Sequence, residues 1–251
     1  MLPKSFKPKK NFELIRIGSD NDGGYLVDKN SILDTKNFIA MGLGDDWCFE
    51  KDFLKLNNCN IFCFDRKINK NFWKKNILKC FEKFILRKIN YKKFRKNIID
   101  NLECRNIFKK NIYFFEGFIA KDKTSKTLKN IISENNLKEK IFLKIDIEGS
   151  EYRILDELIE YQNIIVGMVI EFHNVDINLH KIENFIKNFS LSLIHIHPNN
   201  ADSISKDNIP ISIELSFARN PKIINDNIQL PHPLDCKSRD QNEDHKLEFM
   251  K

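Results

Sequence analysis

The sequence has no long hydrophobic run, little glycine or proline, and no closely paired cysteines. Its longest apolar strand-like run, Ile164–Ile170, is far too short to cross a membrane as a helix. No apolar segment follows the basic N-terminal residues, so we expect neither a signal peptide nor a transmembrane helix. A cytoplasmic protein is the simplest interpretation.

The six cysteines include no Cys-x-x-Cys pair, and their spacing is irregular. A secreted disulfide scaffold would be denser in cysteine and richer in glycine and proline than this chain, which has 8 glycines and 7 prolines. The same spacing argues against a zinc site. We therefore interpret all six as reduced residues that mostly pack.

The chain is long enough to bury a large core without disulfides or metal, and we predict a single domain over residues 1–251. A hydrophobic content of 41% and a charged content of 31% exclude a disordered or fibrous protein. The net charge of +7 is unevenly distributed. Residues 66–110 hold 16 Lys and Arg against 3 Asp and Glu, so the rest of the chain is acidic.

Short β-rich runs alternate with helical patterns, which is typical of an α/β domain. Seven runs predict strands, at residues 37–42, 60–65, 112–115, 141–146, 164–172, 191–197 and 211–218. The central runs are almost continuously apolar, as in parallel strands covered on both faces. Helical patterns lie at residues 49–56, 128–135, 151–161 and 179–189.

The basic segment 66–110 lies between the second and third predicted strands. Its apolar residues fall on one helical face, namely Trp73, Ile77, Cys80, Phe81, Phe84 and Ile85. The segment therefore predicts a basic, helical insertion. It could pack its apolar stripe on the core, or it could form a basic surface for an anionic substrate, RNA or a membrane.

Glycines directly follow the first predicted strand, at Gly42 and Gly44. Such residues let a cofactor approach the backbone, although an ordinary tight turn would look the same. A dinucleotide fingerprint needs a third glycine where this chain has Trp47, so an NAD site is disfavoured. Asp65 ends the second strand 21 residues after Gly44, where a carboxylate can accept hydrogen bonds from both hydroxyls of a ribose. The combination predicts an adenosine-type cofactor without a diphosphate.

Acidic or polar residues also follow the later strands. Because ligands bind at the carboxyl ends of parallel strands, we expect a site at this edge of the sheet. Burying so many carboxylates there would be costly without a ligand or partner. The residues are Asp65, Glu116, Asp146, Glu171 and His197.

At this edge the sequence resembles a known family. Residues 144–151 (KIDIEGSE) resemble the KIDxEGxE signature of FkbM-type S-adenosylmethionine-dependent methyltransferases, and the turn at residues 42–46 (GLGDD) resembles their motif I. The resemblance covers roughly residues 36–220, with looser matches in the leader 16–26 and the tail 230–235. It implies a Rossmann-like class I methyltransferase fold, with a seven-stranded mostly parallel sheet, an antiparallel last strand and helices on both faces. It also implies that the tail belongs to the fold.

The resemblance implies S-adenosylmethionine as cofactor and a role for each matching residue. Gly42 and Gly44 would pass beneath its methionine part, and Asp65 would hold the ribose. Glu116 and Gly117 would lie near the adenine. Asp146 would lie beside the sulfonium. In the leader, the residues that would close over the cofactor are Asp22, Gly23 and Tyr25.

Methyl transfer to a hydroxyl needs alignment and a proton acceptor. The predicted catalytic residues are Asp146, Glu171, His173 and His197. Neutral imidazole is available near pH 7, so His173, His195 and His197 are candidate bases, and His197 lies nearest its strand end. A divalent ion held by the four predicted catalytic residues is an alternative, although we favour a hydrogen-bonded cluster without metal.

The leading hypothesis is an O-methyltransferase acting on a hydroxyl of a sugar or glycan precursor, in cell-surface polysaccharide or related biosynthesis. The basic insertion suggests an anionic acceptor, nucleotide-linked or phosphorylated. An RNA methyltransferase is one alternative, but the chain has no recognisable RNA-binding module and lacks an Asn/Asp-Pro-Pro-aromatic run after the fourth strand. A non-catalytic protein whose insertion docks on a membrane or a protein is another. No DNA partner is predicted.

Overall fold

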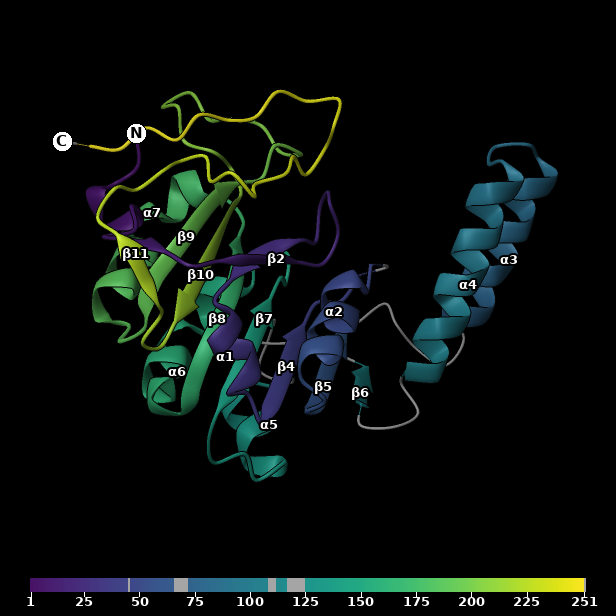
Figure 1. Ribbon diagram of the computed structural model, residues 1–251, viewed down its shortest axis with the longest axis horizontal. Helices are drawn as coiled ribbons and strands as arrows, with labels where there is room; N and C mark the ends of the chain where they lie inside the picture. The colour runs from purple at the N-terminus through teal and green to yellow at the C-terminus, as the bar shows by residue number, and fades with distance from the viewer. Residues whose placement is uncertain (45, 66–71, 108–111, 117–124, 251) are drawn as a thin grey trace.

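The computed structural model describes residues 1–44, 46–65, 72–107, 112–116 and 125–250, apart from the side chains of residues 72–74, 100–107, 112, 114 and 116. A seven-stranded sheet lies at its centre, in the order β6-β5-β4-β7-β8-β10-β9 (Figure 1). Its strands are β4 (Asn37–Met41), β5 (Asn60–Asp65), β6 (Ile112–Glu116), β7 (Ile141–Ile145), β8 (Ile165–Phe172), β9 (Ser192–Pro198) and β10 (Ile213–Ala218).

Only β10 runs against its neighbours, pairing antiparallel with both β8 and β9. The other neighbouring strands pair in parallel. The expected α/β fold with a mostly parallel sheet is confirmed. Each run that predicted a strand overlaps one strand of this sheet, with ends shifted by two residues or fewer.

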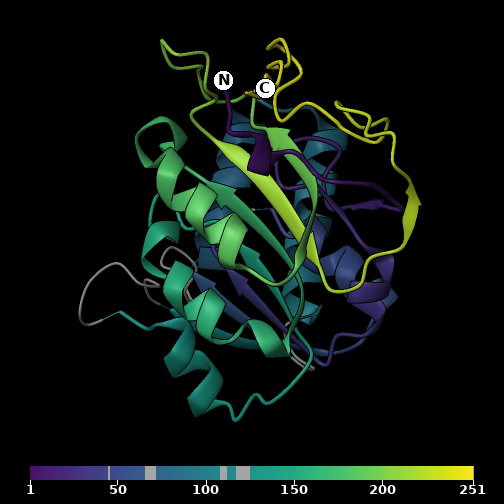
Figure 2. The same cartoon turned by 90° about the vertical axis from the view of Figure 1, so that its left-hand side faces the viewer.

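The central strands are buried on both faces, which explains their unbroken apolar sequence. Alternate residues contribute to two separate cores: Ile39 and Leu143 face one, whereas Phe38 and Phe142 face the other. The first core is covered by α5 (Leu128–Glu134), α6 (Leu155–Glu160) and α7 (Val175–Asn188). The second is covered by α1 (Lys29–Leu33) and α2 (Cys48–Leu56), and Figure 2 shows the two layers on either side of the sheet.

The predicted helix at residues 151–161 does not begin as expected. Residues Glu151–Arg153 form a short 3₁₀ helix, and α6 begins only at Leu155. The reason is that the Glu151 side chain turns inward and accepts hydrogen bonds from the preceding loop. A second 3₁₀ turn follows α6 at Gln162–Ile164.

The leader and the tail are both tied to the body. In the leader, β2 (Ile15–Ile17) and β3 (Tyr25–Val27) form an antiparallel pair, and β1 (Asn11–Phe12) pairs with β11 (Ile223–Asn225). A 3₁₀ turn lies at Lys4–Phe6. The residues before it also meet the tail, because the Leu2 amide donates to the Glu248 carbonyl at 2.7 Å. The tail is thus part of the fold.

Two helices occupy much of the basic segment, α3 (Phe72–Ile85) and α4 (Tyr91–Ile107). They pack on each other and extend away from the sheet, beyond the edge strand β6 (Figure 1). The Phe84 and Phe94 rings stack with centroids 4.5 Å apart, so the buried face of α3 packs on α4 rather than on the sheet. In the described part of the chain, no helix combines the length and hydropathy needed to cross a bilayer.

Candidate active site

The turn after β4 has a backbone conformation that favours glycine. Gly42 and Gly44 have φ angles of +77° and +61°. A Cβ atom on Gly42 would lie 1.6 Å from the carbonyl oxygen of Asp146, so the ends of β4 and β7 touch here. A Cβ atom on Gly44 would meet nothing within 4 Å among the described atoms, so this glycine faces open space.

Asp65 fixes the shape of this turn. It is the last residue of β5, is almost fully buried, and accepts hydrogen bonds through Oδ2 from the Leu43 and Gly44 amides, each at 3.0 Å. The structure therefore places Gly42, Gly44 and Asp65 together. Glu116 pairs with Asp65 across β5 and β6, but its side chain and the whole of Gly117 lie outside the described residues.

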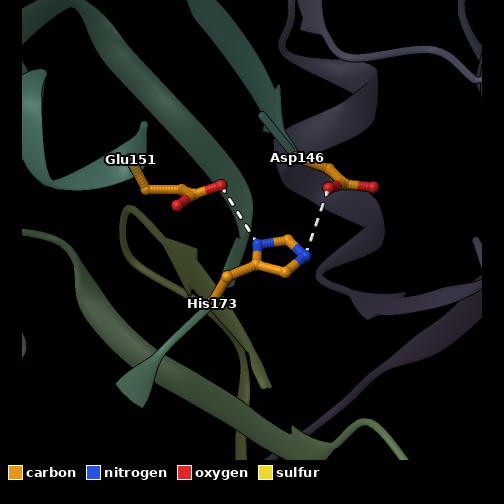
Figure 3. Close-up of side chains that lie close together, drawn as sticks. All are labelled: Asp146, Glu151 and His173. Atoms are coloured by element: carbon orange, nitrogen blue, oxygen red, sulfur yellow. Dashed lines mark hydrogen bonds and ion pairs between the residues drawn. The ribbon is translucent and has the colours of Figure 1, made fainter. Parts of the chain in front are cut away.

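Asp146 and His173 follow neighbouring strands and meet above the sheet edge (Figure 3). The imidazole lies between two carboxylates, with Nδ1 3.2 Å from Oε1 of Glu151 and Nε2 3.9 Å from Oδ1 of Asp146. Nε2 is also 3.8 Å from carboxylate oxygens of Glu148 and Glu171. One nitrogen is thus hydrogen-bonded, and the other faces three carboxylates.

Glu151 organises the loop that carries Asp146. Its side chain is fully buried, and Oε1 accepts hydrogen bonds from the Ile147 and Gly149 amides at 3.1 Å each, in addition to its contact with His173. The Tyr152 hydroxyl donates to the His173 carbonyl at 2.6 Å. No role was predicted for Glu151, although it is the last residue of the KIDIEGSE motif.

Burial and neighbouring charges shift both titrating groups. Burial raises the pKa of Asp146 to about 6, although His173 and Lys144 act in the opposite direction. Burial lowers the pKa of His173, but Glu151 and the other nearby carboxylates outweigh it and raise the value to about 9. At neutral pH His173 is therefore an imidazolium, and the expectation of a neutral base at this position needs correction.

A cavity of about 440 Å³ opens beside these residues. Its wall includes Asp22, Asp146, Glu171, His173, Asn199 and Arg239. The Asn199 side-chain amide donates to Oε1 of Glu171 at 2.8 Å. Burial, Asp146 and Glu214 raise the pKa of Glu171 well above its usual range. More carboxylates than cations line the wall, so the cavity suits cationic or neutral ligands better than anionic ones.

His197 does not share this cavity. It lines a second one, of about 420 Å³, together with Asp235 and residues of the tail. Its Nδ1 is 3.3 Å from Oε2 of Glu214, and Glu214 lies opposite Glu171 on β10. Burial lowers the pKa of His197, but Glu214 outweighs burial and raises it. His195 lies 2.8 Å from the carboxylate of Asp235 and is also buried.

Tyr25 reaches the carboxylate cluster from the leader. It is 3% exposed and packs edge-on against Phe49 with ring centroids 5.5 Å apart. Burial, followed by Glu171 and the other carboxylates nearby, raises its pKa well above the usual range, so it remains a phenol. From the same leader, Asp22 reaches the cavity wall, and Gly23 adopts a φ of +83° beside Asp46.

Within the described part of the chain, two groups of side chains lie close enough to share a cation: Asp146 with Glu151 and His173, and Asp22 with Glu171 and Glu214. In the first group, Oε1 of Glu151 already accepts two amides and contacts Nδ1 of His173. His197 belongs to neither group. The four ligands predicted for a metal therefore do not converge on one point.

The family model described as "Methyltransferase FkbM domain" matches residues 51–191, more than half of the chain. The chain belongs to the FkbM methyltransferase family. This FkbM protein is accordingly an S-adenosylmethionine-dependent methyltransferase, and its family implies that cofactor.

The FkbM protein is also similar in structure to other methyltransferases. The precorrin-6y C5,15-methyltransferase of Geobacter metallireducens is 15% identical, with 76% of this chain and 85% of that chain covered and a TM-score of 0.40. A human "methyltransferase 10 domain containing protein" is 10% identical over 73% and 72% of the two chains, at 0.41. An rRNA methylase of Streptococcus thermophilus is 8% identical over 76% and 93%, at 0.38. No curated protein matches the sequence.

Proposed function

We propose that this FkbM methyltransferase transfers a methyl group from S-adenosylmethionine to a hydroxyl of a sugar or glycan precursor. One observation carries the proposal: Asp146 touches the glycine turn with its backbone and lines the acidic cavity with its side chain. A residue at this junction can face a methyl donor on one side and an acceptor on the other. When bound, the cofactor supplies an electrophilic methyl group on a positively charged sulfur.

The residues around the turn fit that cofactor. Gly44 leaves open the space into which a side chain would project, and Asp65 lies beside it. We assign Gly42 and Gly44 to the methionine part, Asp65 to the ribose, and Glu116 with Gly117 to the adenine. Tyr25 closes this end of the site from the leader. The single antiparallel strand, β10, supports the class I methyltransferase arrangement that the sequence resemblance implied.

The acidic surroundings suit a cationic donor. Opposite charges attract more strongly where water is partly excluded, and the half-buried Asp146 carboxylate lies on the cavity wall. A sulfonium and an α-amino group would both gain from this field. The same field disfavours a phosphate within the cavity.

We assign the role of proton acceptor to Asp146. Its raised pKa makes it a stronger base than an ordinary aspartate, and it is still mostly ionised at neutral pH. His173, charged and held through Nδ1 by Glu151, keeps that carboxylate in position. Glu171 shapes the acceptor side of the cavity. His197 acts only indirectly, through Glu214.

The charge of the cavity also bears on the acceptor. An anionic acceptor was predicted from the basic insertion, but the wall beside Asp146 is acidic. The hydroxyl that enters the cavity therefore belongs to a neutral part of the acceptor, such as a sugar ring, and any phosphate lies outside. The same argument disfavours RNA, whose phosphates accompany every nucleotide.

A divalent ion is the alternative way to activate the hydroxyl. The observation that favours it is Nε2 of His173, which faces Asp146, Glu148 and Glu171 at 3.8–3.9 Å. Methylation assays with EDTA and with added Mg²⁺ separate the two mechanisms. We expect activity to survive EDTA. Activity that EDTA abolishes and Mg²⁺ restores would instead show that a metal ion, and not Asp146, activates the acceptor hydroxyl.

Calorimetric titration with S-adenosylhomocysteine tests the cofactor site. We expect micromolar binding that weakens by about tenfold or more in Asp65→Ala, because a charge-assisted pair of hydrogen bonds is removed. Asp34→Ala, at an exposed ion pair with Lys140, is the matched control. Failure of the wild-type protein to bind would reject the proposal. Incubation with nucleotide-linked and free sugars, followed by mass spectrometry of the products, then identifies the acceptor.

A further inference from the structure

The tip of the α3–α4 hairpin has a well-defined conformation. At the end of α3, the Lys88 amide donates to the Lys83 carbonyl at 2.8 Å, and the Arg87 amide donates to the Phe84 carbonyl at 2.9 Å. Arg87 itself is left-handed, with φ of +54°. These bonds form a Schellman cap. Asn90 then caps α4, accepting the Lys93 amide through its side chain at 2.8 Å.

This tip exposes large apolar side chains. Leu78, Phe81 and Ile85 recur at helical spacing along α3 and are 61%, 46% and 74% exposed. Leu86 and Tyr91 continue the patch across the turn, at 63% and 66%. The adjacent face of α3 packs on α4 through Cys80 and Phe84, and the Phe81 ring meets Phe94 of α4 edge-on with centroids 5.0 Å apart. Five large apolar side chains thus remain 46% or more exposed beside the packed face of the hairpin, and we call Leu78, Phe81, Ile85, Leu86 and Tyr91 the apolar tip.

The same region is strongly basic. Residues 75–99 contain nine Lys and Arg and one acidic residue, Glu82. Among the described residues, none of these nine cations is ion-paired to a carboxylate. Two of the nine, Arg87 and Lys88, lie in the turn between α3 and α4. An apolar stripe with unpaired cations beside it is typical of a segment that lies at a membrane surface.

We propose that the α3–α4 hairpin binds the surface of an anionic lipid bilayer, with the apolar tip inserted at the boundary of headgroups and acyl chains. Charge complementarity favours this partner: the cations would meet lipid phosphates, and each contributes to binding near a negative surface. The aliphatic side chains of Leu78, Ile85 and Leu86 leave water on insertion. This inference concerns a surface outside the cavity and does not depend on the proposed acceptor.

Two other partners fit the tip less well. A nucleic acid would attract the cations and could stack on Phe81 and Tyr91, but it would leave the aliphatic side chains of Leu78, Ile85 and Leu86 in water. A second copy of the hairpin would cover the apolar tip, but it would bring two strongly positive surfaces together and be repelled. The bilayer accommodates both the charge and the apolar residues.

Co-sedimentation of the full-length protein with vesicles tests the proposal. We expect binding to vesicles of equal parts phosphatidylglycerol and phosphatidylcholine, and little to phosphatidylcholine alone. Arg87→Glu/Lys88→Glu should reduce the partition coefficient by about tenfold or more, since it reverses two charges at the tip. The matched control is Lys138→Glu/Lys206→Glu, which makes the same change in net charge at exposed positions of the body.

A second pair of variants tests insertion. Ile85→Ser/Leu86→Ser should also weaken vesicle binding, whereas Ile177→Ser/Ile224→Ser, at positions 73% and 57% exposed, should not. Retained binding of S-adenosylhomocysteine shows that every variant is folded. No binding to anionic vesicles would overturn the proposal. The proposal would also be overturned if the protein bound a labelled oligouridylate more tightly than the vesicles and Ile85→Ser/Leu86→Ser left that binding unchanged. A wild-type dimer that becomes a monomer in Ile85→Ser/Leu86→Ser would overturn it as well.

Discussion

At the scale of single residues, Asp146 and His173 carry opposite charges at neutral pH, a carboxylate and an imidazolium. Asp146 must be ionised to accept a proton, so we expect kcat/KM to rise with pH through its pKa of about 6. Asp146→Asn should lower kcat by about 10²–10⁴-fold while S-adenosylhomocysteine still binds. Glu139→Gln, whose carboxylate is 56% exposed and pairs with Lys36, is the control and should leave kcat nearly unchanged. A kcat/KM that does not change with pH around 6 would show that Asp146 is not the proton acceptor.

His173 makes a separate prediction about stability. Its pKa is 6.5 when unperturbed and about 9 in the fold, so its contribution is complete below pH 6.5 and is lost as the pH rises through about 9. We expect the free energy of unfolding to fall by on the order of 2 kcal/mol over this range, and to fall less in His173→Gln. Urea unfolding at a series of pH values measures this, with the exposed His180→Gln as control. Equal slopes in His173→Gln and wild type would contradict the assignment.

The two glycines of the turn should respond differently to the same change. An alanine Cβ at Gly42 would collide with the Asp146 carbonyl, so Gly42→Ala should prevent folding or greatly lower the melting temperature. At Gly44 the space is open, so Gly44→Ala should fold with a loss of about 1 kcal/mol for the left-handed backbone. Calorimetry should nevertheless show weaker S-adenosylhomocysteine binding in Gly44→Ala. Unchanged binding would mean that no ligand fills this space.

At the scale of elements, the start of the segment after β7 shows what a periodic pattern cannot reveal. Residues 154, 155, 158 and 159 have helical spacing, and a helix over 151–161 was the natural prediction. Glu151 instead accepts two loop amides and holds His173, which delays α6 to Leu155. Helical periodicity reports which side chains are apolar. It does not report that a buried carboxylate binds the backbone.

This role of Glu151 predicts an unequal pair of variants. Glu151→Ala leaves two loop amides without an acceptor and should lower the free energy of unfolding by about 2–4 kcal/mol. Glu151→Gln keeps an oxygen for those amides and should cost less, but it removes a charge that raises the pKa of His173. Chemical denaturation together with NMR titration of His173 measures both effects, and Glu160→Ala on the exposed face of α6 is the control. Equal destabilisation by Glu151→Ala and Glu151→Gln would refute the amide-binding role.

At the scale of the whole molecule, the strands could be predicted because burial on both faces makes their sequences continuously apolar. The Gly42, Gly44 and Asp65 cluster followed from the same reasoning, since strand ends meet at one sheet edge. The separation of His197 from Asp146 could not be foreseen. It depends on Glu214, which lies between them on β10, and on where the tail runs. Pairings between distant segments, such as β1 with β11, leave no local pattern in either segment.

Asn200 links the tail to the rest of the fold, and this link also holds part of the cavity wall. The fully buried side chain of Asn200 accepts the Arg239 amide at 2.8 Å, and its amide donates to the Arg239 carbonyl at 3.1 Å. Arg239 lies on the cavity wall, so Asn200→Ala should loosen that wall. We expect faster hydrogen exchange over residues 236–250 and a higher acceptor KM, with S-adenosylhomocysteine affinity retained. Asn227→Ala, exposed and distant from the cavity wall, should change none of these. If hydrogen exchange in the tail is unaffected by Asn200→Ala, Arg239 must be held by other contacts, and the acceptor KM should then also remain at its wild-type value.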